Sequence, residues 1–207
     1  MKMTALTIDI FSDIICPWCY IGKKRLEAAL KQRPDIQPTI RWRAFMLNPT
    51  MPRAGMDRQT YLKQKFGEGA HAVYDRIARA GLDAGIEFKF NDINKTPETS
   101  AIHTLLIASA QHSFSLSERF FQAYFLQGLD IDEADVQSKL IQDEGCHNLY
   151  TKDALQAAAH QINEDLQFGQ QLGIDGVPLF IFNNQYSLAG AHPEHVLLSA
   201  IDAAVAN

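Results

Sequence analysis

Two cysteines separated by two residues form the motif of this chain that could do chemistry. Cys16-Pro17-Trp18-Cys19 follows an alternating apolar run and opens an amphipathic stretch, which predicts a helix directly after a strand. On a first helical turn the two thiols can close a disulfide, and free backbone N–H groups and the helix dipole stabilise a thiolate at Cys16. Pro17 suits the first helical position, because its missing N–H would have had no partner there. The motif therefore predicts a redox-active pair of thiols.

Two other uses of a Cys-x-x-Cys pair fit the remaining sequence less well. A structural zinc ion needs four ligands, usually from a second pair, and the third cysteine, Cys146, is followed only by His147. A permanent structural disulfide is typical of oxidising compartments, which nothing in the chain indicates. We therefore expect no metal site, and we expect Cys146 to behave as a small buried apolar side chain.

Composition and charge restrict the class of protein and its partners. The chain has 207 residues, of which 46% are hydrophobic and 21% charged, enough for a substantial core. A net charge of −5 without a Lys/Arg-rich block argues against nucleic acid or an anionic membrane as the partner. Asp9, Ser12 and Asp13 interrupt the first apolar run, unlike a secretory signal, and no stretch is long enough to span a membrane. We expect a cytoplasmic protein, in which a disulfide is transient and catalytic.

The first part of the chain predicts a strand, a helix and a second strand. Residues 7–12 alternate as a strand, residues 17–32 form an amphipathic pattern that Pro34 ends, and residues 39–45 alternate again. We expect Lys23 on the face of this helix that meets water. Two strands joined by a helix at this spacing predict a right-handed crossover and a parallel pair.

The last part predicts a hairpin and a helix. Residues 177–182 and 186–189 are apolar segments joined by a turn at Asn183-Asn184, which is typical of two antiparallel strands. A final helix is expected to start near Pro193 and to bury an apolar stripe that includes Leu197.

The segment between these parts is helical in pattern. Helices are expected at residues 59–66, 70–84, 97–112, 116–127, 133–143 and 152–172. The third starts at Thr96-Pro97-Glu98, which offers a capping hydroxyl, a proline at the first position and an acid in the first turn. This order of elements predicts an α/β protein with a thioredoxin-like fold and a large all-helical insertion between its βαβ and ββα halves. We place the thioredoxin-like domain at 1–56 and 173–207 and the helical insertion domain at 57–172.

Three segments carry a resemblance to a known family. Residues 13–22 (Asp-Ile-Ile-Cys-Pro-Trp-Cys-Tyr-Ile-Gly), 45–49 (Phe-Met-Leu-Asn-Pro) and 173–178 (Gly-Ile-Asp-Gly-Val-Pro) appear in the expected order. With them the chain resembles the DsbA family of thiol–disulfide oxidoreductases over its whole length. It is most similar to the cytoplasmic, FrnE-like branch associated with polyketide biosynthesis.

The resemblance implies a substrate-binding loop at Val177-Pro178. In the family the proline of this loop follows a cis peptide bond, which an X–Pro bond adopts at small cost. Pro178 presents no N–H near the sulfurs, and the turn leaves the backbone of Val177 free to pair with an extended substrate segment.

The resemblance also implies a mechanism and its partners. Cys16 is the accessible nucleophile that forms a mixed disulfide, and the more buried Cys19 resolves it. Pro17 and Trp18 tune the thiolate; relatives often carry a histidine between the cysteines, so Trp18 predicts a milder redox potential. The expected partners are protein or low-molecular-weight thiols and disulfides. No cofactor is required, although glutathione is a candidate co-substrate, and the protein is expected to be a monomer or homodimer.

The sequence leaves two other functions possible and does not decide the roles of Asp9 and His103. Hydroxychromene-carboxylate isomerases and kappa-class glutathione transferases share the architecture but use a single Ser or Cys at the position of Cys16, so Cys19 favours redox chemistry. A thioredoxin-like binding module would need neither cysteine. Asp9 is a candidate proton-shuttling carboxylate, but its alternation fits either face of the strand. His103 lies in a segment that the family packs over the active site, where a core role is favoured over substrate contact.

Overall fold

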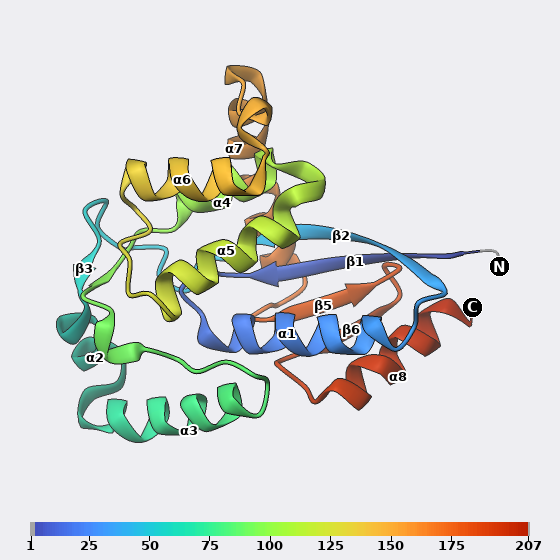
Figure 1. Ribbon diagram of the computed structural model, residues 1–207, viewed down its shortest axis with the longest axis horizontal. Coiled ribbons are helices and arrows are strands. Elements are labelled where there is room, and N and C mark those ends of the chain that lie inside the picture. The colour runs from blue at the N-terminus through green and yellow to red at the C-terminus, as the bar shows by residue number, and fades with distance from the viewer. Residues whose placement is uncertain (1–2, 207) are drawn as a thin grey trace.

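A four-stranded mixed sheet forms the centre of the computed structural model of this chain, which describes residues 3–206 (Figure 1). Its strands follow the order β2-β1-β5-β6, with bounds β1 Thr4–Ser12, β2 Ile36–Ala44, β5 Leu179–Phe182 and β6 Tyr186–Ala189. β1 pairs in parallel with β2 and antiparallel with β5, so that Ile8 lies opposite Ile40 on one side and Phe182 on the other. The predicted parallel pair and C-terminal hairpin are confirmed.

Two helices cover one face of this sheet. α1 (Pro17–Lys31) connects β1 to β2, and α8 (Glu194–Val205) packs beside it. Their buried side chains meet those of the strands in one apolar cluster: Leu6, Ile8, Ile10, Leu26, Ala29, Ile36, Phe180, Phe182, Leu197, Ile201 and Ala204. The alternation of β1 and the apolar stripes of α1 and α8 therefore build the same layer.

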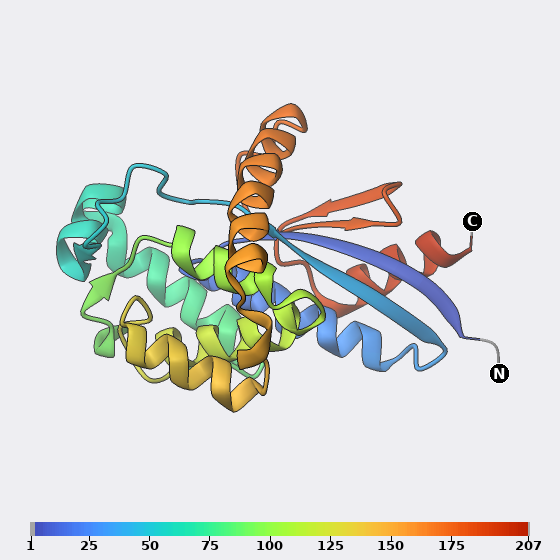
Figure 2. The ribbon, with the colours of Figure 1, turned by 90° about the horizontal axis from the view of Figure 1, so that it is seen from above.

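The other face of the sheet is covered more sparsely. α7 (Lys152–Gln171) packs against β2 and runs across the strands, as Figure 2 shows. A small cluster of Phe11, Leu179 and Ile181 lies on this face, and the ring of Phe168 lies 5.9 Å from that of Phe11.

The segment between β2 and β5 is mainly helical and holds the largest core. Besides α7 it contains α2 Arg58–Phe66, α3 Ala70–Leu82, α4 Ser100–Ala108, α5 Ser113–Phe125 and α6 Ala134–Glu144. α3 and α5 both pack against α1, and Tyr20 of α1 stacks on Phe121 of α5 with a ring separation of 4.9 Å. The α/β class and the thioredoxin-like fold with a helical insertion are confirmed. Among the described residues, no helix has the length and hydrophobicity needed to cross a membrane.

One helix of the insertion begins later than the sequence indicates. The predicted start at Pro97, with Thr96 as the cap, is wrong, because Thr96 belongs to a two-residue strand, β4 (Lys95–Thr96), which pairs with β3 (Met56–Asp57). α4 begins at Ser100, whose backbone N–H donates to the carboxylate of Glu98 at 2.8 Å. The predicted single helix is also interrupted at Ala110, whose φ of 50° is left-handed.

A second difference concerns Lys23. The sequence places it on the water-facing side of α1, but its side chain is 4% exposed. Its ammonium lies 3.1 Å from a carboxylate oxygen of Glu118 and 3.9 Å from the ring centre of Phe114. Both partners belong to α5, so it is the packing of the insertion onto α1 that buries this lysine.

Candidate redox site

The backbone places Cys16 at the opening of α1. Cys16 is the N-cap residue, with extended φ and ψ of −91° and 110°, and Pro17 is the first helical residue. The carbonyl of Cys16 accepts hydrogen bonds from the N–H groups of Cys19 and Tyr20 at 3.0 and 3.3 Å. Its own N–H donates to the carbonyl of Asp13 at 3.0 Å. The first thiol thus lies where free N–H groups and the positive end of the helix dipole favour a thiolate.

Both thiols of the motif are free and nearly covered. Cys16 is 4% exposed and Cys19 is 2% exposed. Cys16 is more covered than the sequence suggests, because its sulfur lies only 3.6 Å from the carbonyl oxygen of Val177. Burial raises the pKa of Cys19 well above its ordinary value, and the neighbouring Cys16 raises it further against the opposing effect of Ser12. Cys19 therefore stays protonated near neutral pH.

The loop before β5 contacts the same helix turn. The peptide bond between Val177 and Pro178 is cis, and the carbonyl of Pro178 accepts the N–H of Gly190 at 2.7 Å. Gly22 of α1 faces this loop: a Cβ added there would lie 2.9 Å from Cγ of Pro178 and 3.1 Å from Cζ of Phe180. The absence of a side chain at Gly22 is what lets the proline approach the helix that carries the cysteines.

The two residues between the cysteines differ in their surroundings. Pro17 is buried, whereas Trp18 is half-buried and packs against the core of the insertion. Cys146 lies elsewhere in that core, with its sulfur 3.5 Å from the hydroxyl of Tyr150. Within residues 3–206, no group of three or more His, Cys, Asp or Glu side chains could hold a metal ion.

A group of buried polar side chains begins three residues before Cys16, at Asp13. One carboxylate oxygen of Asp13 accepts the N–H of Leu47 at 2.8 Å, and the other lies 3.6 Å from Nε2 of His103. The indole N–H of Trp42 donates to Nδ1 of His103 at 3.0 Å, so the proton of the neutral imidazole is on Nε2 and faces Asp13. Asp13 and His103 are both 0% exposed. The Trp42–His103 hydrogen bond joins β2 to the insertion, and the Asp13–Leu47 hydrogen bond joins the loop before Cys16 to the segment after β2. Nε2 of His103 has no hydrogen-bond partner among the described residues.

Asp9 does not belong to this group. Its carboxylate is 2% exposed and pairs with both Arg41 and Arg43 of β2. Arg43 also donates to Asp165 of α7 at 2.9 Å. Asp9 is therefore held in a structural ion cluster, and the buried carboxylate next to the motif is Asp13.

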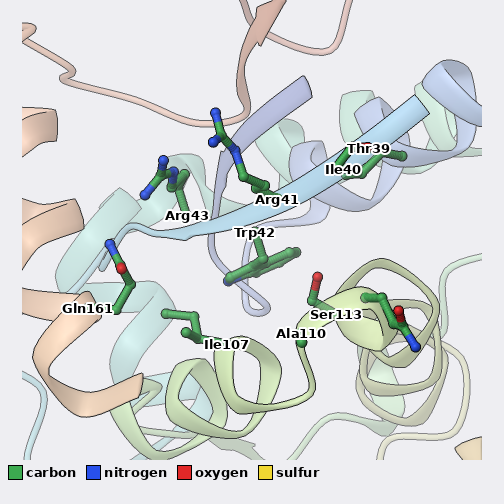
Figure 3. A pocket seen from close by; sticks show the side chains of 10 residues that line it. Thr39, Ile40, Arg41, Trp42, Arg43, Ile107, Ala110, Ser113 and Gln161 are labelled. Carbon is green, nitrogen blue, oxygen red and sulfur yellow. The ribbon is translucent and has the colours of Figure 1, made fainter. Parts of the chain in front are cut away.

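A cavity of about 350 Å³ lies on the outer side of Trp42 (Figure 3). It is lined by Thr39, Ile40, Arg41, Trp42, Arg43, Ile107, Ala110, Gln111, Ser113 and Gln161. In Figure 3 the indole of Trp42 points toward α4 and α5, whereas the side chains of Arg41 and Arg43 point to the opposite side of β2. Alternation along the strand explains this division. Trp42 thus lines the cavity and is hydrogen-bonded to the buried His103.

Comparison with known proteins identifies the group to which this architecture belongs. The family model described as the DSBA-like thioredoxin domain matches residues 7–202. A Bacillus subtilis relative, "Uncharacterized protein YwbO", is 25% identical over 201 residues, which are 94% of each chain.

Solved structures share the fold over nearly the whole chain. The probable DsbA oxidoreductase SCO1869 from Streptomyces coelicolor is 26% identical with a TM-score of 0.81 and covers 96% of this chain and 89% of its own. The cytosolic disulfide reductase DsbM from Pseudomonas aeruginosa is 19% identical with a TM-score of 0.62, covering 97% and 95%, and is also known with GSH. A 2-hydroxychromene-2-carboxylate isomerase is 16% identical with a TM-score of 0.61, covering 95% of each chain. Since the family match spans residues 7–202, the chain belongs to the DsbA-like thioredoxin domain family.

Proposed function

We propose that this protein is a dithiol–disulfide oxidoreductase whose redox centre is Cys16-Pro17-Trp18-Cys19. The observation that carries the proposal is the pair of free thiols at the opening of α1, with the cis-proline loop 3.6 Å from the first sulfur. Membership of the DsbA-like family supports it. We place the protein in the FrnE-like branch and in the cytoplasm.

The proposed reaction proceeds in two exchange steps. The Cys16 thiolate attacks a substrate disulfide, so that the substrate S–S bond breaks, a mixed disulfide forms and one substrate thiolate leaves. Cys19 then loses its proton and attacks the Cys16 sulfur, which releases the second substrate thiolate and closes the Cys16–Cys19 disulfide. The substrate gains two electrons and the protein loses two; the reverse sequence oxidises a dithiol substrate. Burial and the neighbouring Cys16 raise the pKa of Cys19, so Cys19 is still protonated when Cys16 attacks.

We assign substrate positioning to Val177 and Pro178. The Val177 carbonyl already lies beside the Cys16 sulfur, so a substrate segment extended along this loop would bring its own sulfur to the nucleophile. The partners are protein or low-molecular-weight thiols and disulfides, and the DsbM structure with GSH supports glutathione as a co-substrate. Pro17 and Trp18 tune the couple, and Trp18 makes it less oxidising than a histidine at that position would.

A glutathione-dependent isomerase is the second candidate function. It is favoured by the shared fold of the 2-hydroxychromene-2-carboxylate isomerase, which extends over 95% of both chains. In such an enzyme a single thiolate at position 16 suffices, and Cys19 has no chemical role. The presence of Cys19 beside Cys16 favours the oxidoreductase.

Substitution of Cys19 by Ser distinguishes the two functions. In an oxidoreductase, C19S attacks disulfides but cannot release the partner, so a mixed disulfide with glutathione should accumulate in the mass spectrum and insulin reduction should fall to background. The matched control is C146S, which removes a buried thiol outside the motif and should react as the wild type. Disulfide exchange by C19S at the wild-type rate, or turnover of an aromatic substrate that survives C19S, would reject the oxidoreductase mechanism.

A further inference from the structure

Arg58, the first residue of α2, is buried without a charged partner. Its side chain is 3% exposed. The guanidinium donates to three neutral hydroxyl groups: those of Thr96 at 3.1 Å, Tyr74 at 2.6 Å and Tyr124 at 3.4 Å. No carboxylate within residues 3–206 forms an ion pair with it. A further donor, Nε, is buried and has no acceptor.

Burial of this unpaired guanidinium lowers the stability of the protein when no ligand is bound. Arginine is almost never fully buried unless it is paired, because the desolvation of its charge must be offset. The rings of Tyr61 and Tyr74, whose centres lie 5.5 and 5.2 Å from the guanidinium carbon, supply some cation–π attraction. Hydroxyl groups and rings leave the positive charge uncompensated, and an unpaired buried N–H adds to the cost. An anion bound at Arg58 would offset both.

Arg58 also lines a cavity whose shape and walls suit such a ligand. The cavity has a volume of about 460 Å³, within the usual range for small-molecule sites. Its lining residues are Arg58, Leu62, Ala70, His71, Tyr74, Asp75, Ala78, Phe88, Phe90 and Asn91. Phe88 and Phe90 stack with ring centres 4.6 Å apart, and Tyr74 meets Phe90 edge-on at 4.7 Å. The walls combine aromatic and apolar side chains with the polar His71, Asp75 and Asn91 around a single buried cation.

The charges of the lining restrict the ligand further. Asp75 pairs with His71 at 3.0 Å, and both side chains are exposed. The Asp75 carboxylate repels a dianion more strongly than a monoanion, and the single guanidinium of Arg58 balances only one of the two negative charges of a phosphate dianion. The planar fork of arginine matches a carboxylate, and three of its five N–H groups are already used by hydroxyls. A carboxylate monoanion is the best fit.

We propose that this cavity, bounded by α2, α3 and residues 88–91, binds a small organic carboxylate with an aromatic or apolar body. The carboxylate pairs with the guanidinium of Arg58, and the body lies against Phe88 and Phe90. Binding needs neither Cys16 nor Cys19, so it can be tested separately from the redox function.

Benzoate is the probe, and benzamide is its neutral analogue. Titration of the reduced protein, followed by NMR chemical shifts and calorimetry, should give saturable 1:1 binding of benzoate, with shifts concentrated in α2, α3 and residues 88–91. Benzamide should bind at least about tenfold more weakly, which corresponds to about 1.4 kcal/mol. Inorganic phosphate should not compete. Absence of saturation by benzoate, or equal affinity for benzamide, would overturn the proposal.

Three variants locate the binding group. Arg58→Gln should weaken benzoate at least about tenfold and leave benzamide unchanged, whereas Arg76→Gln, which changes an exposed arginine of α3, should bind as the wild type. If Arg58→Gln does not fold, Asp75→Asn decides, because it removes an exposed carboxylate from the lining and should tighten benzoate about two- to threefold. Equal losses in the two arginine variants, or weaker binding by Asp75→Asn, would place the ligand elsewhere.

Discussion

Arg43 lies in the central sheet and Arg58 in the helical insertion, and the two arginines differ in what surrounds their positive charge. Arg43 of β2 lies between two buried carboxylates, with its Nε 2.7 Å from Asp9 and its Nη1 2.9 Å from Asp165. Arg58 of the insertion meets only hydroxyl groups and rings. In the first cluster, carboxylates balance the charge of Arg43 and fix α7 to the sheet. In the second, no negative charge of the described residues balances Arg58. The buried carboxylates of Asp9 and Asp165 are paired and have a structural role, whereas the charge of the buried Arg58 is unpaired within residues 3–206 and is the basis of the proposed ligand site.

Removing a carboxylate from the Arg43 cluster should have the largest effect. Asp165→Ala leaves Arg43 with one carboxylate and deprives the N–H of Ala44 of its acceptor at 3.0 Å. We expect a loss of about 3–5 kcal/mol in the free energy of unfolding, measured by urea denaturation. The control Glu164→Ala changes an exposed acid on the same helix and should cost less than about 0.5 kcal/mol. A loss below about 1 kcal/mol for Asp165→Ala would contradict the importance of charge balance.

Removing the unpaired charge should cost less. Arg58→Met keeps most of the side-chain volume and strands no carboxylate, but it leaves three hydroxyls without their donor. We expect the variant to fold and to lose about 1–3 kcal/mol in the same urea experiment. If Arg58→Met were less stable than Asp165→Ala, Arg58 would be as structurally essential as Arg43, and the distinction between the two clusters would fail.

A half-buried carboxylate, Glu118, allows the effect of charge pairing to be followed against pH. Glu118 of α5 accepts the hydroxyl of Tyr20 at 2.9 Å and lies 3.1 Å from the ammonium of Lys23, both on α1. Burial alone would raise the pKa of Glu118, but Lys23, with Gln122 and Lys24, holds it below the ordinary value of 4.5. A lowered folded-state pKa contributes stability that is present above pH 4.5 and is lost as the pH falls through the folded-state value.

The test is how the difference in the free energy of unfolding between the wild type and Glu118→Gln depends on pH. Glu118→Gln should cost about 1–2 kcal/mol at pH 7. This difference should shrink as urea curves are recorded at pH values falling below 4.5. The difference between wild type and Arg58→Met should stay constant over the same range, since no carboxylate pairs with Arg58 within residues 3–206. A Glu118→Gln difference that grows on acidification would reverse the sign of our assignment.

The smallest effect is expected for an ion pair in full contact with water. Lys139 and Asp143 of α6 are separated by 3.0 Å, with side chains 74% and 43% exposed. Lys139→Ala should change the free energy of unfolding by no more than about 0.5 kcal/mol, within the usual range for such pairs. A loss comparable to that of Asp165→Ala would mean that pairing, rather than burial, sets these energies.

Much of the fold could be predicted from local sequence. The alternation of β1, the apolar stripe of α1 and the turn at Asn183-Asn184 are each contained in a short segment, and the structure has the elements they indicate. The start of α4 could not be predicted in the same way. Thr96-Pro97-Glu98 has the composition of a helix start, but the partner that holds Thr96 in β4 is Met56, forty positions earlier.

In the candidate site, too, some residues could be predicted from local sequence and others could not. Cys16 and Cys19 are adjacent on one helical turn, so their spacing carries the information, whereas the role of Val177 and Pro178 was inferred from family resemblance. The buried group of Asp13, Trp42 and His103 comes from a loop, a strand and a helix. No spacing in the sequence links these residues. His103 is the single titratable residue of the mostly apolar α4, and this is the one local signal of its burial.

The central strand β1 completes its pairing only when the ends of the chain meet. β2 follows β1 after one helix, but β5, which pairs along the other edge of β1, is separated from it by the entire insertion. At a synthesis rate of about 5–20 residues per second, that edge of β1 stays unpaired for on the order of ten seconds before β5 is made. An unpaired apolar strand edge is a template for other strands. Nascent chains stalled within the insertion should therefore be the most aggregation-prone species of this protein, and those most in need of a chaperone.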